Sequence, residues 1–141
     1  MSVVDGLARL LAAQGVGEYR PDGTKYDGTQ PAITDTGVPS TPDQLITLTL
    51  YPGSEGAGED TRNTWTTPRL QVRTRAGTDP RVARDQLDAA VHAVLHGLGP
   101  TVLEDGTELT DCYSLQSAAM SMGQDANGRW EYSRNYQLTL T

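Results

Sequence analysis

Apolar residues recur at helical spacing in the first part of the chain. Ser2–Gln14 predicts a helix, since five apolar side chains fall on one of its sides: Val3, Val4, Leu7, Leu10 and Leu11. Ser2 suits the N-cap position, and Asp5 three residues later resembles a capping box. Gly15 reaches positive φ at little cost, so we expect the helix to end there.

A longer stripe predicts a second helix over Asp79–Gly97. Asp79 is a good N-cap residue, and Pro80 suits the first helical position, where a missing N–H costs nothing. The apolar positions are spaced by three and four residues and indicate a helix that lies across a sheet; they are Ala83, Leu87, Ala90, Val91, Val94, Leu95 and Leu98.

Alternation of apolar and polar residues predicts strands elsewhere. Gln44–Tyr51 and Pro68–Ala76 alternate regularly and should form a hairpin. A short strand is expected at Thr101–Leu103. Asp111–Met122 and Arg129–Thr141 should then form an antiparallel pair, because the Asn-Gly sequence between them favours a hairpin turn. In the last strand, one parity carries Trp130, Tyr132, Tyr136, Leu138 and Leu140.

Two long segments rich in Gly, Pro and polar residues separate these elements. Residues 16–43 predict turns, with room for a short strand at Ala32–Thr34 and with Tyr19, Tyr26 and Ile33 as apolar anchors. Residues 52–67 predict an acidic, Gly-rich loop with a single aromatic residue.

The expected fold is a single α+β domain over residues 1–141. Its order is α-β-β-α-β-β, with a mainly antiparallel sheet packed against two helices. The length of 141 residues suits one domain. No internal repeat is visible, which argues against a solenoid.

Composition narrows the classes of function. The net charge is −7, which disfavours tight non-specific binding to nucleic acid and adsorption to anionic membranes. The single Cys112 cannot form an internal disulfide, and the first residues lack the basic start and cleavage site of an export signal. We therefore expect a soluble protein made in the cytoplasm, with no membrane partner.

Arginines line one side of the predicted strand Pro68–Ala76. Arg69, Arg73 and Arg75 share a parity with Gln71 and form a stripe. The stripe is either a solvated face or a subunit interface, in which arginine is a favoured hot-spot residue. Binding of nucleic acid is a third reading, weakened by the negative charge. Acidic residues that could pair with the stripe in a neighbouring copy are Glu55, Glu59, Asp60, Glu104 and Asp105.

Few residues suggest catalysis or metal binding. Asp88, His92 and His96 have i, i+4, i+8 spacing, so a metal site is conceivable, although a solvated polar face is the more ordinary explanation. Cys112 fits a small buried residue better than a nucleophile. We expect no catalytic residue, no metal and no cofactor, and hence not an enzyme.

The order of these segments resembles the tail terminator, or minor capsid protein, family of long-tailed bacteriophages. The resemblance rests on the first helix, on Gly17–Gly23 (GEYRPDG), on Leu45–Pro52, on Pro68–Arg75 with its following helix, and on the final Tyr-containing hairpin. It covers nearly the whole chain. Each motif alone is only moderately specific, and it is their sequence that carries the resemblance.

The resemblance implies a structural virion subunit. Such proteins form a ring, often of six copies, that caps the head-proximal end of the tail tube and ends its growth. Its partners would be other copies, the major tail tube protein and the head completion (stopper) protein, at the head–tail junction. DNA would pass through the ring without specific binding. This chain's own candidates for the subunit contacts, which the resemblance does not supply, are Arg69, Arg73, Arg75, Glu55, Glu59, Asp60 and Trp65.

Other classes stay open at this point. A stopper or adaptor ring would share many of these features. A tube subunit would be mostly β, and the two predicted helices argue against it. A ligand-binding or enzymatic α+β domain would need convergent polar groups in a pocket, and the sequence offers none.

Overall fold

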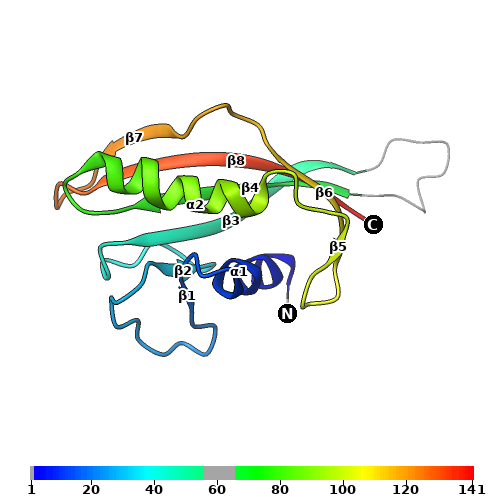
Figure 1. Cartoon of the computed structure of the whole chain (residues 1–141), viewed down its shortest axis with the longest axis horizontal. Coiled ribbons are helices and arrows are strands. Elements are labelled where there is room, and N and C mark those ends of the chain that lie inside the picture. The colour runs from blue at the N-terminus through cyan, green and yellow to red at the C-terminus, as the bar shows by residue number, and fades with distance from the viewer. Residues whose placement is uncertain (1, 56–65) are drawn as a thin grey trace.

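The computed structural model describes residues 2–55 and 66–141 as one mixed α+β sheet with two helical segments (Figure 1). The first helix, α1, spans Val3–Ala13. Ser2 caps it, because its Oγ accepts a hydrogen bond from the backbone N–H of Asp5. Gly15 follows with φ of 79°. The predicted helix and both of its ends are therefore confirmed.

The second helical segment runs between β4 and β5 and contains two kinds of turn. Its first part, η1 (Val82–Asp88), is π-helical, and the second, α2 (Ala89–Leu95), is an ordinary α-helix. Asp79 accepts a hydrogen bond from the N–H of Arg81, which confirms it as the capping residue. The predicted apolar stripe is buried at Ala83, Leu87, Val91 and Leu95. The π-helical turns were not predicted.

The described residues form eight strands in one sheet, whereas the predicted order α-β-β-α-β-β contains four. They are β1 (Glu18–Tyr19), β2 (Ala32–Thr34), β3 (Leu45–Glu55), β4 (Thr66–Arg75), β5 (Thr101–Val102), β6 (Glu108–Ser114), β7 (Met120–Gln124) and β8 (Trp130–Leu140). Their spatial order is β1-β2-β3-β4-β8-β6-β5, and β7 also pairs with β8. Pairs β1–β2 and β2–β3 are parallel, and the others are antiparallel.

The two loops predicted at residues 16–43 and 52–67 are interrupted or shortened by strands in the structure. Residues 16–43 contain β1, which the sequence did not reveal, and β2 at the position where a short strand was admitted. Strand β3 continues through Pro52 to Glu55, and β4 already begins at Thr66. Pro52 lies beyond the stretch of β3 that pairs with β2, so its missing N–H removes no bond to that strand.

Strand β8 is the centre of the antiparallel part. It pairs with β4 along one side, from Glu131 to Leu140. Its other side is shared, because β7 pairs with residues 130–133 and β6 with residues 136–140. The single strand predicted over Asp111–Met122 was therefore wrong. It is two strands that pair with the same side of β8, and they are joined by residues 115–119, which we call the crossover.

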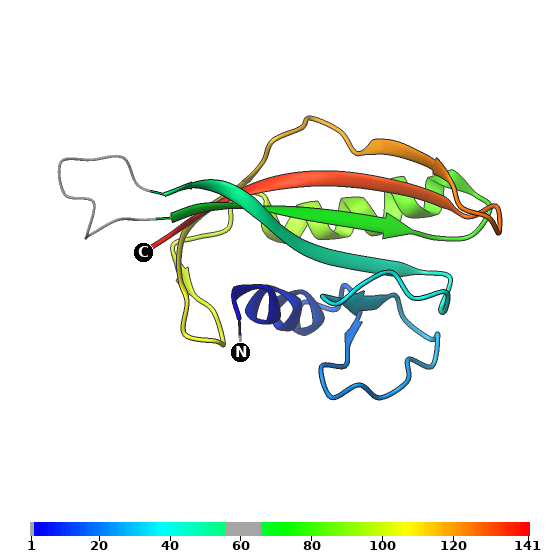
Figure 2. The ribbon, with the colours of Figure 1, turned by 180° about the vertical axis from the view of Figure 1, so that it is seen from behind.

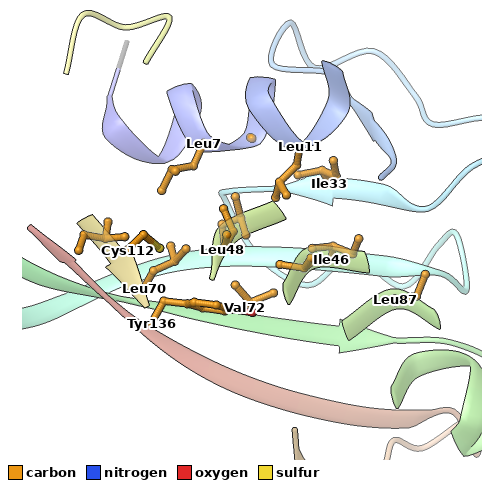
Figure 3. Close-up of a cluster of buried hydrophobic side chains, with 14 of the residues drawn as sticks. Leu7, Leu11, Ile33, Ile46, Leu48, Leu70, Val72, Leu87, Cys112 and Tyr136 are labelled. Carbon is orange, nitrogen blue, oxygen red and sulfur yellow. The ribbon is translucent and has the colours of Figure 1, made fainter. Parts of the chain in front are cut away.

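Both helical segments cover the same face of the sheet. Register pairs Leu48 with Val72 and Val72 with Arg134, so even-numbered side chains of β3, β4 and β8 share this helix face. Figure 3 shows Leu7 and Leu11 of α1 directed toward Leu48 and Ile33. Burial of these apolar side chains is the main source of stability. The core is completed by Ile46, Leu70, Val72, Leu87, Cys112 and Tyr136 (Figure 3).

Candidate functional site

The opposite face of the sheet carries the arginine stripe. We call it the open face, and it presents the odd-numbered side chains of β3, β4 and β8. No helix among the described residues covers it, and in Figure 2 the strands lie in front of α2. Register places Arg69 between Tyr51 and Gln137, and Arg73 between Thr47 and Ser133.

One end of the open face is covered by the chain itself. Arg75 is only 2% exposed, and it donates hydrogen bonds to the carbonyl oxygens of Pro42 (2.7 Å) and Asp43 (3.3 Å). Arg129 similarly donates to Ser40 O and contacts Asp43 Oδ1. Desolvation by burial lowers the pKa of Arg75. Arg75 and Arg129 therefore hold residues 40–43 against the sheet. A neighbouring molecule could not reach Arg75 without moving that segment.

Arg73 lies in the middle of the stripe and already has a partner within the chain. Its Nη2 donates to Oε2 of Glu131 at 2.6 Å, with 34% of the arginine side chain exposed. Its Nε has no hydrogen-bond partner, and neither does Oδ1 of Asn135 nearby on β8. Buried polar atoms are normally satisfied. Both atoms are buried, so an incoming surface could reach them only if the side chains around them move.

The remaining predicted interface residues divide into three groups. Arg69 is exposed and makes no ion pair with another described residue. Glu55 ends β3, where its backbone pairs with Thr66. The other three predicted residues, Glu59, Asp60 and Trp65, lie outside the described residues. The structure thus leaves Arg69 as the freely accessible member of the stripe, and a role in a subunit contact stays a prediction.

A second polar cluster lies on the helix face, where the sequence predicted a solvated surface or a metal site. Arg134 donates to both carboxylate oxygens of Asp88, at 2.9 Å (Nη2–Oδ2) and 3.3 Å (Nε–Oδ1). Both side chains are almost fully buried. Nη1 of Arg134 also lies 3.2 Å from Nδ1 of His92. The prediction of a solvated face at Asp88 was wrong, because an arginine from β8 covers it.

This cluster holds the crossover between β6 and β7. Arg134 donates to the carbonyl oxygen of Gln116 (3.2 Å) and to Ser114 Oγ (3.3 Å). Nδ1 of His96 accepts the backbone N–H of Ser114 at 3.0 Å. Gln116 Oε1 accepts the N–H of Asn135 at 2.7 Å. The three residues Asp88, His92 and His96 are therefore used to position a loop.

Protonation of His92 should weaken this arrangement. Burial lowers its pKa, and the charge of Arg134 and the neighbouring His96 lower it further, while Asp88 acts in the opposite sense. An unfolded chain takes up this proton near the ordinary pKa of 6.5. The unfolded state thus binds more protons below that pH, so His92 contributes stability above 6.5 that is lost as pH falls toward its folded pKa.

We accordingly expect the melting temperature to fall as pH is lowered from 7 to 5, partly because of His92. Thermal unfolding followed by circular dichroism at each pH measures it. His92→Gln cannot take up the proton, so its melting temperature should depend less on pH across this range. His96→Gln is the matched control on the next turn. If the variant at His92 keeps the full wild-type dependence, other groups carry the effect.

Among the described residues, the other chemistry-bearing groups do not assemble into a catalytic arrangement. Cys112 is fully buried, and burial raises the pKa of its thiol to about 12, so it is a thiol and not a thiolate at neutral pH. No group of three metal-binding side chains occurs within residues 2–55 and 66–141. In the same ranges, no helix is long and apolar enough to cross a membrane.

A hollow at the surface measures about 620 Å³ and lies beside residues 19–26. Two of its polar side chains already have partners within the chain. Tyr19 donates to Asp5 (2.7 Å) and is near Asp35 (3.3 Å), and Tyr26 donates to the Ile33 carbonyl. This hollow is open, and its polar side chains do not converge as they would around a substrate.

Comparisons with known proteins point to one kind of assembly. The sequence matches, over residues 10–141, a family model described as bacteriophage tail terminator protein. The fold is similar to a chain in a solved structure titled "Virion of native gene transfer agent (GTA) particle", with a TM-score of 0.61 and 14% identity. That match covers 99% of this chain and 98% of the other. A comparison with curated proteins finds no match.

Proposed function

Since this chain belongs to the bacteriophage tail terminator family, a family of structural tail proteins, we propose that it forms a closed ring, of six copies, that caps the head-proximal end of the tail tube. The ring ends growth of the tube and offers the surface to which the filled head is joined. The observation that carries this proposal is the family match over residues 10–141.

The geometry supports a role in assembly over one in chemistry. The open face is a broad sheet surface with an exposed arginine, and beneath it lie a buried donor and a buried acceptor without partners among the described residues. Surfaces of this kind suit protein contacts, in which arginine anchors are common and buried polar atoms find partners on binding. A closed ring needs each copy to use two different patches in head-to-tail contacts.

The proposed partners are the neighbouring copies, the major tail tube protein and the head completion protein. The net charge of −7 suits a lumen through which DNA moves without being held, because few cations are available to bind phosphate. The proposed location is the head–tail junction of the virion.

Electron microscopy of the purified protein, alone and mixed with isolated tail tubes, tests this function. Closed rings that cap one end of the tubes are the expected result. Capped tubes should also stop elongating when tube protein is added. Rings that bind only to DNA-filled heads would indicate a stopper or adaptor ring instead, and a protein that stays monomeric with tubes present would exclude the terminator function.

The arginine stripe can be tested separately at Arg69. Because this side chain is exposed and makes no ion pair with a described residue, Arg69→Glu should leave the melting temperature nearly unchanged. If the stripe faces an acidic patch of a neighbour, ring formation should weaken about tenfold or more, as sedimentation velocity would measure. Arg84→Glu, an exposed arginine on η1, is the control. Normal rings with Arg69→Glu would make the stripe a solvated surface.

A further inference from the structure

One side of the sheet is formed by a stretch of chain without charge. From Cys112 to Gln124 there is no Asp, Glu, Lys, Arg or His, although charged residues make up 21% of the whole sequence. This stretch comprises the end of β6, the crossover 115–119 and β7. We call residues 113–124 the uncharged edge.

The uncharged edge gathers most of the exposed apolar side chains of the described residues. Six large hydrophobic residues are exposed among the described residues, and four of them belong to this edge: Tyr113, Leu115, Met120 and Met122. Register places Tyr113 opposite Gln137 and Met120 opposite Ser133, so both lie on the open face. Methionine is common at surfaces that bind partners, because its side chain adapts to them.

Strand β7 is also an edge strand without the usual protection. It pairs with β8 on one side and with no other described strand. Free edges are normally blunted by charged residues or proline, since they would otherwise pair with another chain. Strand β7 has neither, and only a bulge between Ser121 and Gly123 interrupts it. Its position is fixed, because Arg134 and His96 hold the crossover that leads into it.

The chain contains a second uncharged edge, at β3. Residues 44–54 carry no charged side chain. Strand β2 borders β3 only over Leu45–Thr47, and from Leu48 onward no described strand lies on that side, although α1 packs against Leu48 from the helix face (Figure 3). Thr49 and Pro52 are exposed. Because the strand order runs from β3 through β4 and β8 to β7, the two uncharged edges lie on opposite sides of the same sheet.

We infer that the occupant of the uncharged edge is a second copy of this chain, with β7 of one copy adding to the outer side of β3 in the next. The inference rests on the proposed ring and names its subunit contact. An uncharged edge meets an uncharged edge, so no charge is left without a partner. The contact uses two different patches and therefore repeats head to tail, as a closed ring requires.

The strand directions fit this contact. Strand β7 is antiparallel to β8, β8 to β4, and β4 to β3, so β7 and β3 run in opposite directions. Copies rotated about an axis that runs roughly along the strands keep this relation, and the new pair is then antiparallel. On the open face Met120 of one copy then faces the region of Thr49 and Tyr51 of the next, where sulfur and aromatic ring can pack.

A charge placed on the uncharged edge should prevent the contact. Met120→Asp and Met122→Asp are expected to reduce ring formation at least tenfold in sedimentation velocity, with melting temperatures close to that of the wild type. Val102→Asp is the matched control, because Val102 is an even more exposed apolar residue, on β5. Val102→Asp should form rings normally, and normal rings for both methionine variants would overturn the inference.

Disulfide trapping tests whether β7 of one copy and β3 of the next are the strands in contact. Cysteine at Met120 or Met122 is combined with cysteine at Thr49 or Tyr51, giving four double variants that cover neighbouring registers. Oxidation of at least one should give a ladder of covalent oligomers that ends at the closed ring. Buried Cys112 does not compete. If rings form and none of the four variants gives a ladder, this contact is wrong while the ring stands.

Three further outcomes separate this contact from the function itself. Covalent dimers from Met120→Cys alone would mean that β7 pairs with β7, which overturns the inference. If the wild type neither forms rings nor caps tail tubes, the proposed function fails. If rings form normally with Met120→Asp but no longer join tubes, the edge binds the tube protein and the second copy is not its occupant.

Discussion

Arg134→Ala is expected to lower the free energy of unfolding by about 3–5 kcal/mol, because it leaves a buried carboxylate without its cation. Asp88 and Arg134 are almost fully buried and joined by two hydrogen bonds. The arginine also satisfies Gln116 O and Ser114 Oγ, so the crossover loses its support as well. Urea unfolding monitored by fluorescence measures the loss.

Two further variants separate the charge from the packing. The double variant Asp88→Leu with Arg134→Met removes both charges and should recover most of the stability, since apolar pairs often replace a buried ion pair without cost. Arg84→Ala is the surface control, because its partner Asp85 is exposed, and it should leave the urea midpoint unchanged. If Arg134→Ala is no worse than Arg84→Ala, Asp88 must reach solvent.

Leu11→Ala is expected to lower the free energy of unfolding by about 2–5 kcal/mol. Leu11 has no exposed surface, and Figure 3 shows its side chain beside Ile33 beneath α1. Truncation leaves a cavity between helix and sheet, which the surrounding backbone cannot fill.

Leu10→Ala is the matched control for this prediction. It removes the same atoms from the same helix but from a half-buried position, so it should cost clearly less. Urea unfolding of both variants checks the difference. Equal losses would mean that α1 contributes through helix propensity, and that its packing on β3 matters little.

The parts of the fold that could be predicted are those in which local chemistry and periodicity agree. Ser2 and Gly15 mark the ends of α1, and Asp79 caps the second helical segment. Regular alternation located β3, β4 and β8. The resemblance to tail terminators, drawn from the order of these elements, is confirmed by the family match over residues 10–141.

What could not be predicted depends on contacts between distant residues. Strand β1 has two residues and exists because β2 pairs with it. The break after Ser114 depends on Arg134, twenty positions further along, and on the hydroxyl of Ser114 bonding to Gln116. One signal was available, because Arg134 shares its parity with Tyr132 and Tyr136 and therefore needed a buried partner.

The candidate site also has a part that could be predicted from the sequence and a part that could not. The arginine stripe was recognised as one side of a strand, and Arg69 fits that description. The sequence could not reveal that Arg75 is used to fasten residues 40–43, or that Arg73 is paired with Glu131. Each of these contacts joins residues more than thirty positions apart, so periodicity along one strand carries no information about them.

Strand β8 comes last in the chain, and this order determines when the other strands can pair during synthesis. During synthesis β4, β6 and β7 all leave the ribosome before the strand to which they hydrogen-bond. Until residues 130–140 emerge, β4 has only β3 beside it, and Asp88 lacks the arginine that neutralises it. A partly translated chain therefore lacks both the β7–β8 pairing and the neutralised Asp88 until its last residues emerge.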